Sequence, residues 1–337
     1  MSVLDDLQSR AAAHPAHIVL SEGFDPRIVS AAVQAVAAGL GRITLVGDTH
    51  TVTRELTAIG AAPSRALQIA DPAISPHTDH VARTYFELRQ HKGVTHEVAE
   101  KQARDPLVFA AMLVRLGHAD GTVGGAVATT SDTVRAALQV IGKAADAPLV
   151  SSFFLMALPK GHPSGRGAMI FSDCGLVIDP SATELSAIAA QSAASCRALM
   201  AETPKVALLS FSTKGSARHD AVTKVTDALE HLRANHPDIA ADGELQFDAA
   251  FVPSVGSSKA KGSDVAGHAN VMVFPNLDAG NIGYKIAQRI GGCMAIGPVL
   301  QGLAKPANDL SRGCTADDVV HMIAVTALQA AALKERT

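Results

Sequence analysis

The sequence predicts an α/β protein of about two domains, built from parallel sheets covered by helices. Its length of 337 residues suits two domains, and 47% of the residues are apolar against 18% charged, which is enough to bury sizeable cores. Short apolar runs alternate with alanine-rich helical segments, the pattern of βαβ units. The 10 Phe and 2 Tyr residues, with no Trp, indicate cores filled by small aliphatic side chains.

Charge and cysteine usage exclude several classes of partner. The net charge of -3 and the pI near 6.5 offer no broad basic field, so nucleic acid is not an expected partner. The four cysteines are widely spaced and no His lies near them at metal-ligand spacing, so we expect neither a metal nor disulfides. Asp5 and Asp6 stand where a secretory signal is basic, and no span approaches the roughly 18 apolar residues of a membrane helix. We expect a cytoplasmic protein with no membrane partner.

The first βαβ unit is predicted at the N-terminus. Residues His17–Leu20 form an apolar strand, Ile28–Ala38 an alanine-rich helix and Arg42–Val46 a second strand. The loop Ser21–Arg27 follows the carboxyl end of the first strand. It is either the rim of an active site or a plain connection.

The next helix is predicted at His80–His91 and ends at Lys92-Gly93. Arg89 lies in its last turn. It either complements the helix dipole, as basic residues often do there, or takes part in a site.

A glycine- and hydroxyl-rich loop follows the strand His118–Val123. Residues Gly124–Asp132 contain Thr129, Thr130 and Ser131 just before the predicted helix Thr133–Ile141. The backbone N–H groups of such a loop can cradle phosphate, and Arg135 in the first turn would add charge. The alternative is simple N-capping by Ser131 or Asp132.

The second domain is expected to begin after the hinge Ala145–Pro148. Two apolar strands, Leu149–Ala157 and Gly167–Phe171, are joined by a polar turn, and this hairpin predicts a mixed sheet. Further along, Phe247–Phe251 is predicted as a core strand, and Tyr284–Ile290 as a helix. Arg289 on that helix is either a site residue or a solvated one.

The polar loop Asn308–Asp318 carries the most chemistry in the chain. It places a hydroxyl (Ser311), a permanent cation (Arg312) and the carboxylates of Asp317 and Asp318 beside the start of a C-terminal helix. This combination indicates a site for an anionic substrate. Thr315 and Asp318 also have the spacing of a capping box, so Asp318 has a second, purely structural interpretation.

Long strings of the sequence are similar to the phosphate acetyltransferase family, in its short single-module form. The strings are Asn270–Arg289 and Ala295–Cys314, and the match continues through Leu88–Gly93, Ala119–Gly121 and Leu209–Ala217. The resemblance implies reversible acetyl transfer between acetyl phosphate and coenzyme A, by direct thiolate attack in a ternary complex. Coenzyme A and acetyl-CoA would be substrates, and no tightly bound cofactor is implied.

The same resemblance implies an architecture. Two αβα-sandwich domains with a cleft between them, like those of isocitrate and isopropylmalate dehydrogenases, would comprise residues 1–145 plus 298–337 and residues 146–297. The second domain would form a homodimer interface.

The resemblance also implies roles for single residues. Asp318 corresponds to the proposed base for the coenzyme A thiol, Ser311 to a hydroxyl near the reacting centre and Arg312 to a phosphate-binding cation. These residue types suit the chemistry, because a thiol of pKa about 8.5 needs a base at neutral pH and the leaving phosphate needs cations. Further substrate contacts are expected from Arg89, Arg135, Arg289, Thr130 and Ser131. The sequence departs from the common pattern at Ala136, where relatives often carry Pro.

Other functions remain open at this point. Acyl length depends on pocket volume, so a phosphate butyryltransferase is the nearest enzymatic alternative, although the region Asn281–Lys285 favours acetyl. A noncatalytic acyl-CoA-sensing module is a second alternative. A nicotinamide-dependent dehydrogenase is disfavoured because the dinucleotide fingerprint is missing.

Overall fold

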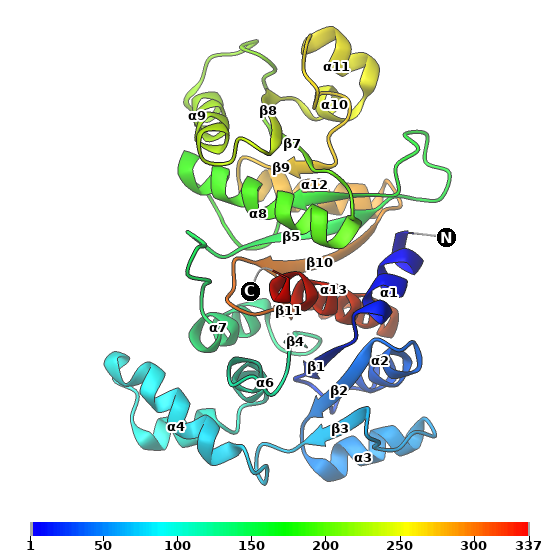
Figure 1. The fold of residues 1–337 in the computed structure, drawn as a ribbon, viewed down its shortest axis with the longest axis vertical. Coiled ribbons are helices and arrows are strands. Elements are labelled where there is room, and N and C mark those ends of the chain that lie inside the picture. Colours follow the sequence, from blue (N-terminus) through cyan, green and yellow to red (C-terminus); the bar gives the residue numbers. More distant parts are fainter. Residues whose placement is uncertain (1–2, 336–337) are drawn as a thin grey trace. The chain divides into compact units, whose positions relative to one another are not determined.

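The computed structural model describes residues 3–335, which fall into two compact units (Figure 1). Unit A comprises residues 4–145 and 303–335, and unit B comprises residues 146–302 together with residue 3. Each unit is a sheet with helices on both faces, so the predicted α/β fold of two αβα sandwiches is confirmed.

Unit A contains a five-stranded sheet in the order β11-β4-β1-β2-β3, in which all neighbouring strands are parallel. Its strands are β1 (Ala16–Leu20), β2 (Gly41–Val46), β3 (Leu67–Ala70), β4 (Gly121–Gly124) and β11 (Ala307–Asp309). The last strand comes from the C-terminal segment and pairs with β4. The chain therefore returns to its first sheet near its end.

The helices of unit A cover both faces of this sheet. They are α1 (Val3–Ala13), α2 (Pro26–Ala37), α3 (Thr49–Ala58), α4 (Thr78–Arg89), the 3₁₀ turn η1 (Gln90–Lys92), α5 (His96–Gln102), α6 (Pro106–Arg115), α7 (Thr130–Val140) and α13 (Ala316–Lys334). Helices α2 and α13 pack together on one face, and α6 and α7 pack together on the other (Figure 1). The starts of α2 and α6 share one local signal, a capping Asp followed by Pro in the first helical position, which is preorganised for a helix.

Helix α13 is the core helix of unit A. Among the described residues it is the one helix long and apolar enough to cross a membrane by length and composition. The expectation that no span approaches this length is therefore wrong for Ala316–Lys334. In the structure 61% of its apolar window is buried, and it contacts α2, β1 and β4. Its hydrophobicity is accounted for by burial on both the sheet and neighbouring helices.

Unit B contains a six-stranded sheet in the order β10-β5-β6-β9-β7-β8. Its strands are β5 (Ser151–Ala157), β6 (Ala168–Ser172), β7 (Lys205–Leu209), β8 (Ala240–Leu245), β9 (Val271–Val273) and β10 (Met294–Gln301). Strands β5 and β6 form the predicted antiparallel hairpin, and β10 is antiparallel to β5, whereas β6, β9, β7 and β8 are parallel. The predicted mixed sheet is thus confirmed.

Helices also cover the sheet of unit B. They are α8 (Ala182–Met200), α9 (Asp220–Asn235), α10 (Phe247–Phe251), α11 (Pro253–Lys259) and α12 (Leu277–Arg289). The prediction of a core strand at Phe247–Phe251 is wrong, because these residues form α10. The core strand is β8, just before it. A five-residue apolar run cannot be assigned to strand or helix by periodicity alone.

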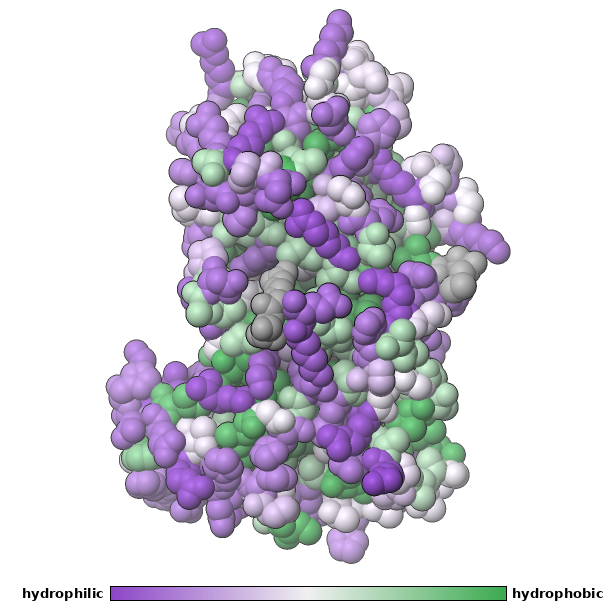
Figure 2. Space-filling view, in the orientation of Figure 1, coloured by the Kyte–Doolittle hydropathy of each residue, from purple (hydrophilic) through white to green (hydrophobic). Residues whose placement is uncertain are grey.

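On the face shown in Figure 2, hydrophilic and hydrophobic side chains are mixed. The hydrophobic side chains form no continuous belt on this face. This mixture is ordinary for a folded protein, since apolar atoms contribute much of any protein surface.

Candidate active site

The strand order of unit A marks one edge of its sheet as a binding edge. Strands β1, β4 and β11 are adjacent and parallel, so their carboxyl ends lie at the same edge. From there β1 leads into α2 on one face, while β4 leads into α7 on the other. The order of strand addition therefore reverses at β1, because β2 and β3 are added on one side of it and β4 and β11 on the other. In open α/β sheets, ligands bind at such a switch point, outside the carboxyl ends of the strands.

The polar loop predicted to bind an anion begins at this edge. Strand β11 ends at Asp309, and the Leu310 N–H donates a 2.8 Å hydrogen bond to the Gly124 carbonyl at the end of β4. The next residues, Ser311, Arg312 and Gly313, are exposed. The loop is therefore anchored at its start while its hydroxyl and guanidinium remain accessible.

Arg27 joins three segments at this edge. Its guanidinium pairs with Asp25 at 2.8 Å, donates to the carbonyls of Arg312 (2.7 Å) and Cys314 (3.1 Å), and donates to the Ala126 carbonyl at 2.8 Å. The hydrogen bonds from Arg27 also hold the pKa of the Asp25 carboxyl below its ordinary value. Arg27 thus fixes the loops after β1, β4 and β11 to one another.

The Glu22 side chain is hydrogen-bonded to the backbone of the glycine- and hydroxyl-rich loop. Its buried carboxylate accepts hydrogen bonds from the N–H groups of Ala126 (2.7 Å), Val127 (3.0 Å) and Ala128 (2.7 Å). The interpretation that these N–H groups cradle phosphate is therefore wrong for residues 126–128. An internal carboxylate already takes the position that an external anion would need.

The start of α7 is capped by Thr129, and not by Ser131 or Asp132. The Thr129 hydroxyl accepts from the Asp132 N–H, and Thr130 is the first helical residue. The Arg135 side chain, 56% exposed, pairs with Asp132 at 2.7 Å and donates to the Ser131 hydroxyl at 3.1 Å. The structure thus brings Ser131 and Arg135 together on one exposed turn.

Asp318 caps α13, as its capping-box spacing predicts. Its Oδ2 accepts from the Thr315 N–H (2.8 Å) and hydroxyl (2.9 Å), and its own N–H donates to the Thr315 hydroxyl. None of these hydrogen bonds uses Oδ1. Asp318 is half-buried, so one carboxylate oxygen holds the helix start and the other is free of the cap.

The two remaining arginines lie on different units. Arg89 is the last residue of α4, which packs against α7 through the Tyr85 hydroxyl and Gln139, 3.3 Å apart. Its Nε is buried and has no hydrogen-bond partner among the described residues. Arg289 is the last residue of α12 in unit B, so it does not belong to the switch-point edge of unit A.

Two further titratable groups lie beside the polar loop. Asp309 is fully buried, and burial raises the pKa of its carboxyl to about 7. Burial also raises the pKa of the Cys314 thiol, so this cysteine is unsuited to act as a nucleophilic thiolate. No cluster of three or more His, Cys, Asp and Glu side chains within residues 3–335 could hold a metal ion.

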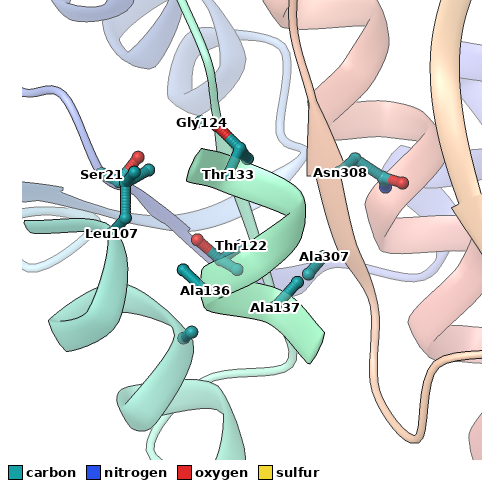
Figure 3. A pocket seen from close by; sticks show the side chains of 10 residues that line it. Ser21, Leu107, Thr122, Gly124, Thr133, Ala136, Ala137, Ala307 and Asn308 are labelled. Atoms are coloured by element: carbon teal, nitrogen blue, oxygen red, sulfur yellow. The ribbon is translucent and has the colours of Figure 1, made fainter. Parts of the chain in front are cut away.

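A small cavity lies inside unit A behind this edge (Figure 3). Ser21, Gly124 and Thr133 are among the residues that line it. Its volume of about 10 Å³ has room for roughly one water molecule, so it cannot hold a substrate.

Sequence reasoning did not single out Glu22, Arg27 or Asp309. Glu22 and Arg27 belong to the loop Ser21–Arg27, for which the sequence allows either a site rim or a plain connection, and the structure places that loop at the switch point. The sequence signal that could have identified Glu22 and Arg27 is an acid and an arginine that follow the first strand of a βαβ unit.

Comparisons with known proteins point to the same family along the whole chain. The family model of phosphate acetyl/butaryl transferases matches residues 2–327. The phosphate acetyltransferase of Paracoccus denitrificans is 52% identical over 98% of this chain and 99% of its own length. The crystal structure of a phosphotransacetylase from Streptococcus pyogenes is 43% identical, covers 98% of both chains and superposes with a TM-score of 0.90.

A more distant likeness concerns the fold alone. A 4-hydroxythreonine-4-phosphate dehydrogenase from Klebsiella pneumoniae is 12% identical, covers 95% of this chain and 99% of its own, and has a TM-score of 0.53. This is consistent with the predicted dehydrogenase-like architecture. From the family match and the close relatives, this chain belongs to the phosphate acetyl/butaryl transferase family of acyltransferases.

Proposed function

We propose that this protein catalyses the reversible transfer of an acetyl group between acetyl phosphate and coenzyme A, by direct attack of the thiolate in a ternary complex. The observation that carries the proposal is the 52% identity to a phosphate acetyltransferase over nearly the whole of both chains. The switch-point edge of unit A supplies the residue types that this reaction needs.

In the proposed mechanism, Asp318 removes the proton from the coenzyme A thiol. The Oδ1 atom that the helix cap leaves free is the oxygen available for this step. The resulting thiolate attacks the acetyl carbonyl carbon, a carbon–sulfur bond forms, and the bond from that carbon to the phosphate oxygen breaks. Capping α13 and accepting a proton are therefore compatible roles for one carboxylate.

The exposed residues of the polar loop would act on the reacting groups. Arg312 would bind the phosphoryl group and stabilise the charge on the departing phosphate, and Ser311 would donate a hydrogen bond near the acetyl carbonyl. The hydrogen bonds from Arg27 to the carbonyls of Arg312 and Cys314 hold the loop backbone. The side chains of Ser311 and Arg312 remain accessible. This arrangement is preorganisation, since the loop need not be ordered during the reaction.

The other arginines would bind the anionic parts of the substrates. Arg135, with Ser131 and Thr130 beside it on the first turn of α7, would contact phosphate groups at the helix N-terminus. Ala136 lies inside α7, where it lines the small cavity. Arg89, whose Nε has no hydrogen-bond partner within residues 3–335, is proposed as a further phosphate contact, and so is Arg289 at the end of α12 in unit B.

The test of the function is to mix the purified protein with acetyl phosphate and coenzyme A and to follow thioester formation. We expect rapid acetyl-CoA formation, and slower turnover with butyryl phosphate. Faster turnover with butyryl phosphate would instead identify the protein as a phosphate butyryltransferase. If neither substrate gave a thioester while the protein still bound acyl-CoA, the protein would be a noncatalytic acyl-CoA-sensing module.

We further propose that the protein is cytoplasmic and uses only diffusible substrates, with no tightly bound cofactor, metal, nucleic acid or membrane partner. Its four cysteines are free, as is usual in a reducing compartment.

We also propose a homodimer formed through unit B, with residues 146–297 as the domain that supplies the interface. Ile282, Ile286 and Ile290 recur every four residues along and just beyond α12 and are 58%, 52% and 83% exposed. Ile178 (75%) and Met294 (43%) are further exposed apolar residues of the same unit. A stripe of this kind on an amphipathic helix is typical of a surface that packs against another protein, and a second copy of the chain is the occupant we propose.

Replacing Ile286 with Glu is expected to convert the dimer to monomer at micromolar concentration. A charge buried without a partner at a self-complementary interface costs several kcal/mol on each side. Light scattering during size-exclusion chromatography measures the mass. Ile59→Glu is a matched control, because Ile59 is 49% exposed but lies in unit A. A dimer that survives Ile286→Glu would place the interface elsewhere.

A further inference from the structure

Two buried acids lie at the carboxyl ends of strands β1 and β11, at the binding edge. Glu22 follows β1 and is 3% exposed, while Asp309 ends β11 and is 0% exposed. Strand β4 lies between these two strands. Burial is the main cause that raises the pKa of the Asp309 carboxyl to about 7, and the negative charge of Glu22 adds to it in the same direction. A carboxyl buried without hydrogen-bond donors favours its protonated form.

The two acids have different surroundings. Three backbone N–H groups donate to the Glu22 carboxylate, and donors of this kind stabilise the charged form. By contrast, neither oxygen of Asp309 has a hydrogen-bond partner of good geometry among the described residues. The Thr130 and Thr133 hydroxyls lie toward it and favour its charged form, but burial outweighs them. Asp309 is therefore the acid of the two that lacks donors of good geometry to stabilise its charged form, and it is the one that takes the proton.

Asp309 is also packed directly against the loop that Glu22 holds. Gly125 has φ +96°, and a Cβ at this position would collide with Asp309 Oδ1 and lie 3.0 Å from the Leu310 backbone nitrogen. The carboxyl of Asp309 therefore contacts the backbone that connects β4 to residues 126–128. A charge on Asp309 would therefore act directly on the loops that follow β4 and β11.

Other charged groups surround this pair on the elements packed against it. They are Asp25 and Arg27 after β1, Asp132 and Arg135 on α7, and Asp317, Asp318 and His321 near the start of α13. Arg27 pairs with Asp25 and Arg135 pairs with Asp132, so each of these cations already has an acidic partner. Burial lowers the pKa of His321, so this residue is neutral near pH 7 and does not offset a charge on Asp309.

We propose that Asp309 is a positioning residue that must be protonated for the loops 124–130 and 310–315 to hold the arrangement that binds substrate. This inference rests on the proposed acetyl transfer, because those loops carry Ser311 and Arg312. Ionisation of Asp309 places an unpaired charge inside the buried contact between its carboxyl and the Gly125 backbone, and the two loops separate to admit water to it.

The test compares wild type with Asp309→Asn, which has the shape of the protonated acid and cannot ionise. The measured quantity is the ratio of kcat/KM for wild type to that for the variant, from pH 5.5 to pH 9. Titration of the coenzyme A thiol affects both enzymes equally and cancels in this ratio. Since the pKa of Asp309 is about 7, the ratio is expected to be constant below pH 6 and to fall about tenfold from that level by pH 8.

A second readout does not depend on activity. The pKa of Asp309 is higher in the folded protein than in the unfolded chain, so the folded state binds the extra proton between about pH 4 and pH 7. Stability of the wild type therefore falls as pH rises through that window, whereas Asp309→Asn escapes this loss. The melting temperature of the variant relative to wild type should increase from pH 4 to pH 8.

The outcomes separate this proposal from the proposed function. Asp6→Asn, which removes an exposed carboxyl of unit A, should give a flat kcat/KM ratio and a flat melting difference. A flat ratio for Asp309→Asn, or its failure to fold, would overturn the role of the proton on Asp309. Absence of acetyl transfer in the wild type, together with the expected melting behaviour, would instead overturn the proposed function and retain the buried proton.

Discussion

Replacing Asp318 with Asn is expected to lower the turnover number for acetyl-CoA synthesis by about 10²- to 10⁴-fold, the usual contribution of a general base. The amide oxygen of Asn can still accept from the Thr315 N–H, so α13 should begin at the same residue and the protein should remain folded. Steady-state kinetics with saturating acetyl phosphate and coenzyme A measure the turnover, and circular dichroism checks the fold.

The matched control for this variant is Thr315→Ala, which removes the capping hydroxyl and keeps the carboxylate. It should cost about 1 kcal/mol of unfolding free energy and leave most of the turnover. Equal losses of turnover in both variants would mean that Asp318 acts only by starting the helix.

Replacing Arg312 with Gln should lower kcat/KM for acetyl phosphate by about 10²- to 10³-fold, as expected when a donor to developing charge is removed. Gln keeps a polar side chain of similar length but lacks the permanent charge and the guanidinium fork. Because Arg312 is exposed and its backbone carbonyl, which Arg27 binds, is unchanged, stability should be nearly unaffected.

The control for the lost charge is Arg54→Gln. Arg54 is exposed on α3, which packs beside β3 at the opposite edge of the sheet from β11. This variant should match wild type. If Arg312→Gln kept wild-type use of acetyl phosphate and lost only affinity for coenzyme A, Arg312 would belong to the nucleotide end of the substrate.

Local sequence signals predicted a large part of this fold. The capping box at Thr315 and Asp318 and the hairpin of β5 and β6 depend on residues close together in the chain, and both are present. The strand that the sequence predicts at Phe247–Phe251 is wrong, because a short apolar run satisfies strand and helix patterns equally.

The candidate site was only partly predictable. Residue types alone identified Ser311 and Arg312 as a group able to bind an anion. The contacts of Glu22 and Arg27 could not be predicted, because they connect the ends of three strands that are about 100 to 290 residues apart in sequence. Pairing of β11 with β4 creates these contacts, and three residues of strand carry too weak a local signal to predict it.

The return of the C-terminal segment to unit A also bears on how the chain is made. Unit B is almost entirely one continuous stretch, residues 146–302, and can close as soon as that stretch has left the ribosome. Unit A must wait for residues 303–335, because until then β4 has an unpaired edge and the faces that α13 covers on β1 and α2 are open to water. The nascent chain is therefore most exposed to aggregation until residues 303–335 have emerged, and the segment carrying Ser311 and Asp318 is the one that closes unit A.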